Sequence, residues 1–214
     1  MKKGCILCLL ISVISLPLIA QNIIYSNLKE LLAQHGDTTA VLRVEKRSRN
    51  QIVLTGGADY RITAGDDELM CRRLKKRCFA VRDEKGDLYL NCRKLRYKKL
   101  RFGAWYAPAV QLGKNIYFCA MPLGSVIGGN FVEEDDVKLG GNIGDALAAS
   151  SLVTKRVCYE LNGETGKVDF LGKDKMLQLL KNYPELKQAY LKDDSQEAKH
   201  TFKYLLELQN KQKK

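Results

Sequence analysis

Short apolar runs, broken by polar and glycine-containing turns, occupy most of the first 171 positions of the chain. Short runs rich in β-branched and aromatic residues between such turns are typical of β-strands. The pattern predicts strands at 38–44, 51–55, 59–63, 78–82, 88–92, 95–100, 107–112, 116–121, 153–161 and 167–171. It also predicts short helices at 27–34, 69–74 and 144–151, and a long surface loop at 122–142.

The pattern changes at position 173, after which apolar residues recur at spacings of three and four, as on one face of a helix. They predict one helix carrying Met176 and Leu180, a second that begins at Pro184, and a third capped by Ser195. Strands followed by helices are typical of an α+β fold with a mainly antiparallel sheet. We therefore predict a single α+β domain over residues 21–214, mostly β from 21 to 171 and helical from 172 to 210. An open sheet and a partly closed barrel both fit this order.

The segment from Cys78 to Cys92 predicts a hairpin. Residues 83–87 read DEKGD, which suits a type I turn with Gly86 in the left-handed region. In that register Asp83 faces Asp87, and Cys78 falls opposite Cys92. A disulfide between Cys78 and Cys92 and a pair of separate buried thiols both fit this arrangement.

The first twenty residues have the three-part pattern of a secretory signal peptide. Lys2 and Lys3 give a positive start, 6–14 is apolar, and Ala20 precedes the expected cleavage site. The apolar run is shorter than the roughly 20 residues that a membrane span needs, although an uncleaved anchor is the alternative. We predict export to the periplasm or the cell exterior, with no lipid anchor and no transmembrane span in the mature chain. Five cysteines remain after cleavage, an odd number, so pairing in an oxidising compartment leaves at least one thiol.

The basic charge of the chain is concentrated in one segment. The formal net charge is +12, and residues 71–102 hold thirteen basic and three acidic side chains. This segment accounts for the whole excess of the mature chain, and such a concentration attracts anions. The predicted anion-binding residues are Arg72, Arg73, Arg93, Lys94, Arg96, Lys98, Lys99 and Arg101.

Aromatic residues lie within and beside the basic segment. Tyr97, Trp105 and Tyr106 are predicted to stack on a ligand, with burial in the core as the alternative for the aromatic residues of this region. An acidic glycan, the phosphates of lipopolysaccharide or a protein partner fits such a surface. Nucleic acid is not the expected partner, because the protein is predicted to be exported.

Residue spacing provides no sign of catalysis. The five cysteines that remain after the expected cleavage do not form a CxxC pair, and His35 and His200 stand apart from them in the sequence. The chain also lacks HExxH and GxSxG motifs. We therefore predict no metal and no cofactor, and a noncatalytic binding protein. A barrel-like carrier of a small apolar ligand and an unrecognised hydrolase are the alternatives.

Four stretches of the chain resemble a known group of proteins. They read VEKRSRNQIVLTGGADYRI at 44–62, CRKLRYKKLRFGAWYAP at 92–108, YFCAMPLGS at 117–125 and YPELK at 183–187. Together they resemble an uncharacterised family of small exported proteins from Bacteroidetes-type gut bacteria. The resemblance implies export and a single folded unit, and it implies no activity.

Overall fold

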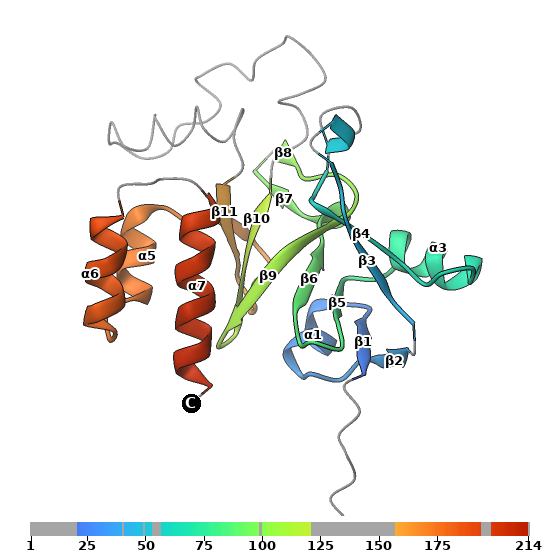
Figure 1. The fold of residues 1–214 in the computed structure, drawn as a ribbon, viewed down its shortest axis with the longest axis horizontal. Coiled ribbons are helices and arrows are strands. Elements are labelled where there is room, and N and C mark those ends of the chain that lie inside the picture. The colour runs from blue at the N-terminus through green and yellow to red at the C-terminus, as the bar shows by residue number, and fades with distance from the viewer. Residues whose placement is uncertain are drawn as a thin grey trace, which may run out of the picture.

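The computed structural model describes residues 21–39, 41–48, 50–52, 57–98, 100–120, 157–193 and 198–213 (Figure 1). Its strands are β1 (Asn22–Tyr25), β2 (Asp37–Thr39), β3 (Arg43–Lys46), β4 (Tyr60–Thr63), β5 (Ala80–Arg82), β6 (Leu88–Asn91), β7 (Arg96–Tyr97), β8 (Leu100–Arg101), β9 (Tyr106–Leu112), β10 (Asn115–Ala120), β11 (Val157–Leu161) and β12 (Val168–Phe170). Its helices are α1 (Leu28–Leu32), α3 (Glu68–Lys76), the 3-10 turn η1 (Cys92–Lys94), α5 (Lys173–Leu179), α6 (Pro184–Lys192) and α7 (Ala198–Gln212).

Ten of the described strands form one antiparallel sheet. Its order is β12-β11-β10-β9-β6-β5-β1-β2, and β4, paired with β3, joins it at β9. This confirms the predicted α+β fold. No ladder joins β12 to β2, so the sheet is open and the partly closed barrel is wrong. The apolar-ligand carrier therefore lacks the closed barrel that it required.

Both faces of the central strands of this sheet are buried, whereas β2 and β3 are mostly exposed. One face carries a single core along most of the sheet, which includes Leu90, Phe118 and Tyr159. The other face is divided between two covers (Figure 1). Helices α5, α6 and α7 cover β9, β10 and β11, while α3 and the β3–β4 hairpin cover β1, β5 and β6.

Strand β10 shows how its sequence produces this two-sided burial. Side chains of a strand point alternately to opposite faces. Ile116 and Phe118 face the first core, whereas Tyr117 and Cys119 face α7. An uninterrupted apolar run is what a strand buried on both faces requires.

The hairpin turns follow the sequence closely. Asp83 N donates to Asp87 O at 3.0 Å, and Gly86 has φ +84°, as the DEKGD turn predicts. Arg82 pairs with Leu88, which places Asp83 opposite Asp87. The β9–β10 and β11–β12 hairpins also lie where predicted, as do α3 and the helix that begins at Pro184.

Three predicted strands differ in the structure. The run at 38–44 is divided into β2 and β3, and residues 50–52 are helical where a strand at 51–55 was expected. The run at 95–100 is not one bulged strand, because Lys98 adopts φ +51° and reverses the chain between β7 and β8. The loop at 122–142, the helix at 144–151 and the Ser195 cap lie outside the described residues.

The structure forms a disulfide at a different place from the predicted one. Cys119 and Cys158 are paired residues of β10 and β11, and their sulfurs are bonded. Cys78 and Cys92 are free thiols in different cores. The prediction placed both cysteines on one face by assuming that strand β5 extends back to Cys78. Strand β5 begins only at Ala80, and Cys78 belongs to the turn that ends α3, where its N–H donates to Arg73 O.

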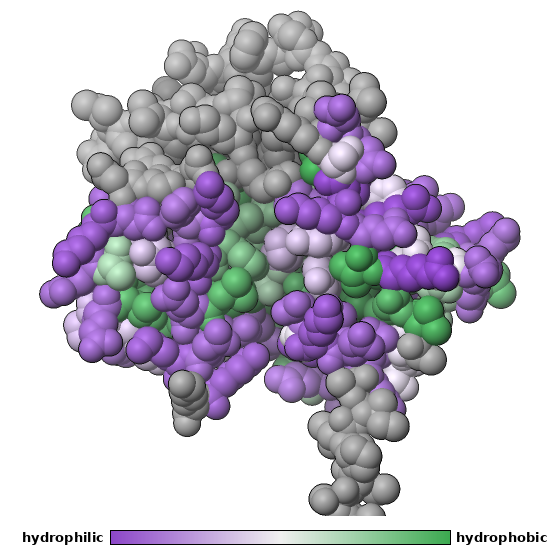
Figure 2. Space-filling model, viewed as in Figure 1, coloured by the Kyte–Doolittle hydropathy of each residue, from purple (hydrophilic) through white to green (hydrophobic). Residues whose placement is uncertain are grey.

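Hydrophilic residues cover most of the described surface on the face shown in Figure 2, and apolar residues show between α7 and the neighbouring strands. None of the helices in the described ranges combines the length and the apolar character needed to cross a membrane.

Two buried tyrosines give a matched test of the core. Tyr159 is fully buried, and its hydroxyl has no hydrogen-bond partner among the residues that the structure describes. The Tyr106 hydroxyl, by contrast, donates to Leu74 O at 2.7 Å. We expect Tyr159→Phe to raise the free energy of unfolding by about 1 kcal/mol, because it removes an unsatisfied buried group. Tyr106→Phe should lower it by about 1 kcal/mol. Urea unfolding followed by circular dichroism measures both, and a loss of stability in Tyr159→Phe would contradict this account of the core.

Candidate anion-binding site

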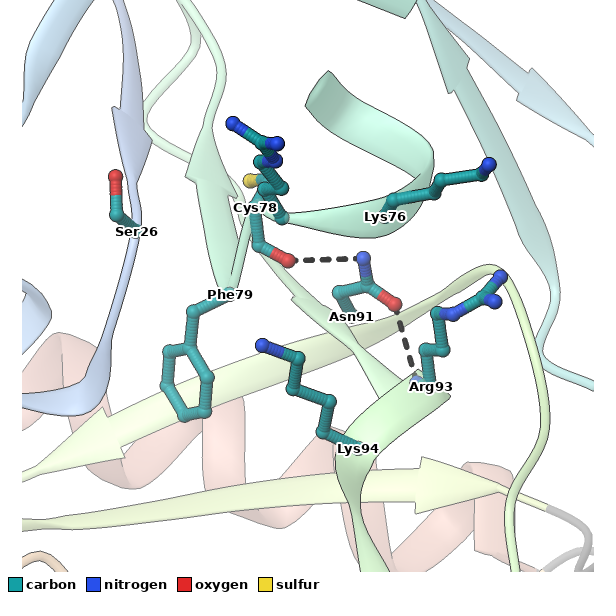
Figure 3. A pocket seen from close by; sticks show the side chains of 8 residues that line it. Ser26, Lys76, Cys78, Phe79, Asn91, Arg93 and Lys94 are labelled. Atoms are coloured by element: carbon teal, nitrogen blue, oxygen red, sulfur yellow. Dashed lines mark hydrogen bonds between the residues drawn. The ribbon is translucent and has the colours of Figure 1, made fainter. Parts of the chain in front are cut away.

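A small pocket lies where the end of α3, the approach to β5 and the start of η1 meet (Figure 3). Its volume is about 20 Å³, enough for one water or for a single oxygen-sized group of a ligand. The lining residues are Ser26, Lys76, Arg77, Cys78, Phe79, Asn91, Arg93 and Lys94.

Asn91 fixes the geometry of this pocket from inside the protein. It is only 4% exposed, and its amide donates to Leu74 O at 3.1 Å and to Cys78 O at 2.9 Å. Its side-chain oxygen accepts a hydrogen bond from Arg93 N at 3.1 Å. One side chain therefore joins the last turn of α3 to the first residues of η1, and in Figure 3 it lies between Lys76 and Cys78 on one side and Arg93 and Lys94 on the other.

The pocket is positively charged. Lys76, Arg77, Arg93 and Lys94 are all exposed, and no acidic side chain is among the lining residues. None of the four forms an ion pair with a residue that the structure describes. Like charges gathered around one concavity repel each other, and a bound anion relieves that repulsion.

Cys78 does not provide a nucleophile to this pocket. Burial raises the pKa of its thiol to about 11, and its sulfur lies 3.1 Å from Ala80 O. Because the thiolate is the reactive form, this thiol is inert near neutral pH. What the pocket offers a ligand is charge, together with the hydrogen-bond donors of the four basic side chains.

The structure divides the predicted anion-binding residues into groups. Arg93 and Lys94 line the pocket, and Arg72 is exposed on α3. Arg73 instead forms an ion pair with Asp37 on β2 and donates a hydrogen bond to Ser26 Oγ at 3.3 Å. These contacts link α3 to the edge of the sheet.

The remaining predicted cations belong to another element. Arg96, Lys98 and Arg101 are exposed on the β7–β8 hairpin, which packs against β12. Lys99 lies outside the described residues. The structure therefore gathers only part of the basic segment at the pocket.

The structure buries two of the three aromatic residues that were predicted to stack on a ligand. Tyr97 and Tyr106 are 2% and 1% exposed, so neither ring is open to a ligand. The Tyr97 ring packs against Tyr159, with the ring centres 5.5 Å apart. Trp105 is partly buried and stands beside three basic side chains.

Sequence reasoning missed several members of this region. Lys76 and Arg77 belong to the basic segment, but the predicted helix 69–74 ends before them, whereas α3 runs to Lys76 with Arg77 as its C-cap. Arg47 and Arg61 lie outside that segment, and they reach Trp105 because β4 pairs with β9 through Tyr60 and Tyr106. No local signal indicates that pairing.

An acid–histidine pair is present elsewhere in the fold. His200 Nδ1 lies 2.9 Å from Asp193 Oδ2, and the Tyr204 hydroxyl donates to the same oxygen at 3.4 Å. The pair joins the end of α6 to the start of α7, and none of its members lines the pocket. Within the described ranges, no three histidine, cysteine or acidic side chains are gathered as metal ligands.

Comparison with protein-family models gives a match over most of the chain. A family model described as "Family of unknown function (DUF6563)" matches residues 23–212. The chain belongs to this family. The match spans both the pocket and the helices that cover the sheet, and it confirms the resemblance to an uncharacterised family. No curated protein and no solved structure matches this DUF6563 chain.

Proposed function

We propose that this DUF6563 protein is a noncatalytic, exported binding protein that holds anionic groups of an envelope component. They bind at the pocket lined by Lys76, Arg77, Arg93 and Lys94, here called the four-cation pocket. The component is an acidic glycan or the phosphate-bearing part of a lipopolysaccharide. The observation that carries the proposal is that four basic residues, Lys76, Arg77, Arg93 and Lys94, line one concavity that has no acidic lining residue.

These four cations come from two elements whose relative position is fixed. Asn91 ties α3 to η1 by hydrogen bonds within the protein, so little has to be ordered when a ligand binds. Arginine suits bidentate contact with carboxylate, sulfate or phosphate, and lysine adds a mobile point charge. The pocket is small, which favours entry of a single acidic group while the remainder of the ligand stays on the surface.

Export is part of the proposal. The signal-like first twenty residues and the Cys119–Cys158 disulfide support it, because disulfides persist in oxidising compartments and are rare in the cytosol. The mass of the protein recovered from its producing cell is the test. A mature chain that begins near residue 21 is expected, and a chain that retains the first twenty residues in the cytoplasm would refute export.

Charge reversal tests the pocket. We expect the double variant Arg93→Glu/Lys94→Glu to weaken binding of a uronate oligosaccharide, and of polyphosphate, by more than about tenfold at low ionic strength, because two attractive contacts become repulsive. Isothermal titration calorimetry of the mature protein measures the affinity. Wild-type affinity for both polymers should fall as salt is raised.

The matched control changes the same number of charges elsewhere. Lys181→Glu/Lys211→Glu alters exposed residues near the ends of α5 and α7, on the opposite side of the molecule from α3 (Figure 1). It should retain affinity within about twofold. Equal losses in both variants would show that net charge alone attracts the polymer, and the pocket proposal would then fail.

A further inference from the structure

Trp105, the only tryptophan of the chain, is held in an unusual backbone conformation just before β9. Its φ is +80°, in the left-handed region that bulky residues rarely adopt. Hydrogen bonds on both sides hold it there: Ala104 O accepts from Ala58 N at 3.1 Å, and Trp105 O accepts from Cys92 N at 3.0 Å. Residues kept in sparsely populated conformations are concentrated at functional sites, so this position is a candidate for one.

Three basic side chains, from the residue after β3, from β4 and from α3, lie near the indole. The charged ends of Arg47, Arg61 and Lys75 lie 5.4, 5.7 and 5.8 Å from the ring centre. Arg47 is fixed, since it is 8% exposed and donates to Ala58 O at 2.7 Å and to Gln51 O at 3.0 Å. Arg61 and Lys75 are exposed, and neither forms an ion pair with any residue in the described ranges.

This arrangement favours an anion beside the ring. The ring attracts each cation through its negative face. The three cations lie no more than about 12 Å from one another, close to one Debye length, so their repulsion is only partly screened. An acidic group between Arg61 and Lys75 offsets that repulsion, and it does so next to an apolar ring surface.

The Trp105 cluster adjoins the four-cation pocket through two connections. Lys75 directly precedes Lys76 in α3, and the Trp105 carbonyl bonds to Cys92, the first residue of η1. Arg93 and Lys94 follow in that same turn. The two sets of cations are therefore carried by neighbouring segments of the fold, α3 and the chain on either side of the Cys92–Trp105 hydrogen bond.

We propose that Trp105, Arg61 and Lys75 form a second subsite that binds a uronate residue of an acidic glycan, while another acidic group of the same glycan occupies the four-cation pocket. This inference rests on the proposed function and names its ligand. A uronate carries a carboxylate for the two basic side chains and an apolar C–H face for the indole. Polyphosphate has repeated charges without a ring, so it suits the pocket and gains nothing from Trp105.

The single tryptophan gives a direct test. Wild-type mature protein is titrated with an oligogalacturonate and, separately, with a polyphosphate of equal charge, and both affinity and tryptophan emission are followed. We expect both polymers to bind, the glycan about tenfold more tightly, and only the glycan to change the emission. The variant Arg61→Gln/Lys75→Gln should lose about tenfold in glycan affinity and lose the emission change, with less than about threefold loss for polyphosphate.

The possible results distinguish failure of the Trp105 subsite from failure of the proposed anion-binding pocket. Equal affinities for the two polymers with unchanged emission would overturn the second subsite, while the loss of binding in Arg93→Glu/Lys94→Glu would still support the pocket. Binding of neither polymer at low ionic strength would overturn both. The control Lys181→Gln/Lys211→Gln should retain the glycan preference, and a loss of preference there would also count against the Trp105 subsite.

Discussion

Reduction of the Cys119–Cys158 disulfide is expected to lower the free energy of unfolding by about 4 kcal/mol. The bond joins residues 39 positions apart, and opening a loop of that length returns this much chain entropy to the unfolded state. A loss of this size is a large part of the total stability of a domain, which is typically about 5–15 kcal/mol.

The position of this bond adds to its expected effect. Cys119 and Cys158 face the core beneath α7, and their sulfurs lie 3.6 and 3.4 Å from Ala198 O at the start of that helix. Breaking the bond therefore loosens the pairing of β10 with β11 and the surface on which α7 packs.

Urea unfolding with and without a thiol reductant measures the effect. The wild type should lose about 4 kcal/mol in reductant, and Cys119→Ala/Cys158→Ala should be equally unstable under both conditions. Cys71→Ser, which changes a free thiol, should respond to reductant as the wild type does. Identical unfolding midpoints for the oxidised and reduced wild type would rule out a stabilising disulfide.

Gly57→Ala is expected to cost about 3 kcal/mol of stability. Gly57 has φ +84°, and a β-carbon there would overlap Ala104 O and lie 3.2 Å from Trp105 Cδ1. The obstacle is backbone rather than a flexible side chain, so the Ala58 N to Ala104 O hydrogen bond has to lengthen or break. The same shift displaces Trp105, and its emission spectrum should change.

Gly86→Ala is the matched control. Gly86 has the same φ of +84°, but a β-carbon added there meets nothing within 4 Å. This variant should lose only about 1 kcal/mol, the cost of the left-handed conformation. Chemical denaturation of both variants isolates the steric contribution, and equal losses in the two would show that Trp105 is not held by the close approach of Gly57.

Local chemistry in the sequence predicted the hairpins and helices well. The turn at 83–87 needs a residue with positive φ and has Gly86 there, so its register followed directly. Pro184 begins α6 because its missing N–H leaves no bond unmade at a helix start. Predictions failed where the chain reverses without such a signal, as at Lys98, which interrupts the predicted strand 95–100.

The candidate site was only partly predictable for a similar reason. The basic segment indicated anion binding, and Arg93 and Lys94 do line the pocket. The sequence predicts that Tyr97 and Tyr106 stack on a ligand, whereas both rings are buried in the structure. An aromatic residue beside cations has the same sequence pattern in a core as on a surface. The sequence predicts that Arg73 binds a ligand, whereas in the structure it pairs with Asp37, 36 positions away.

The sequence alone specified the hairpin turns, the helix that begins at Pro184, the α+β order and the amount of positive charge in 71–102. Turns, helix starts and composition depend on neighbouring residues, which is why the sequence shows them. Tertiary structure was needed to choose between Cys78–Cys92 and Cys119–Cys158, and to bring Arg47 and Arg61 to Trp105. Those outcomes depend on which strands pair across the sheet, as β10 does with β11 and β4 with β9. Such pairings are set by packing over the whole core, and no local run of residues encodes them.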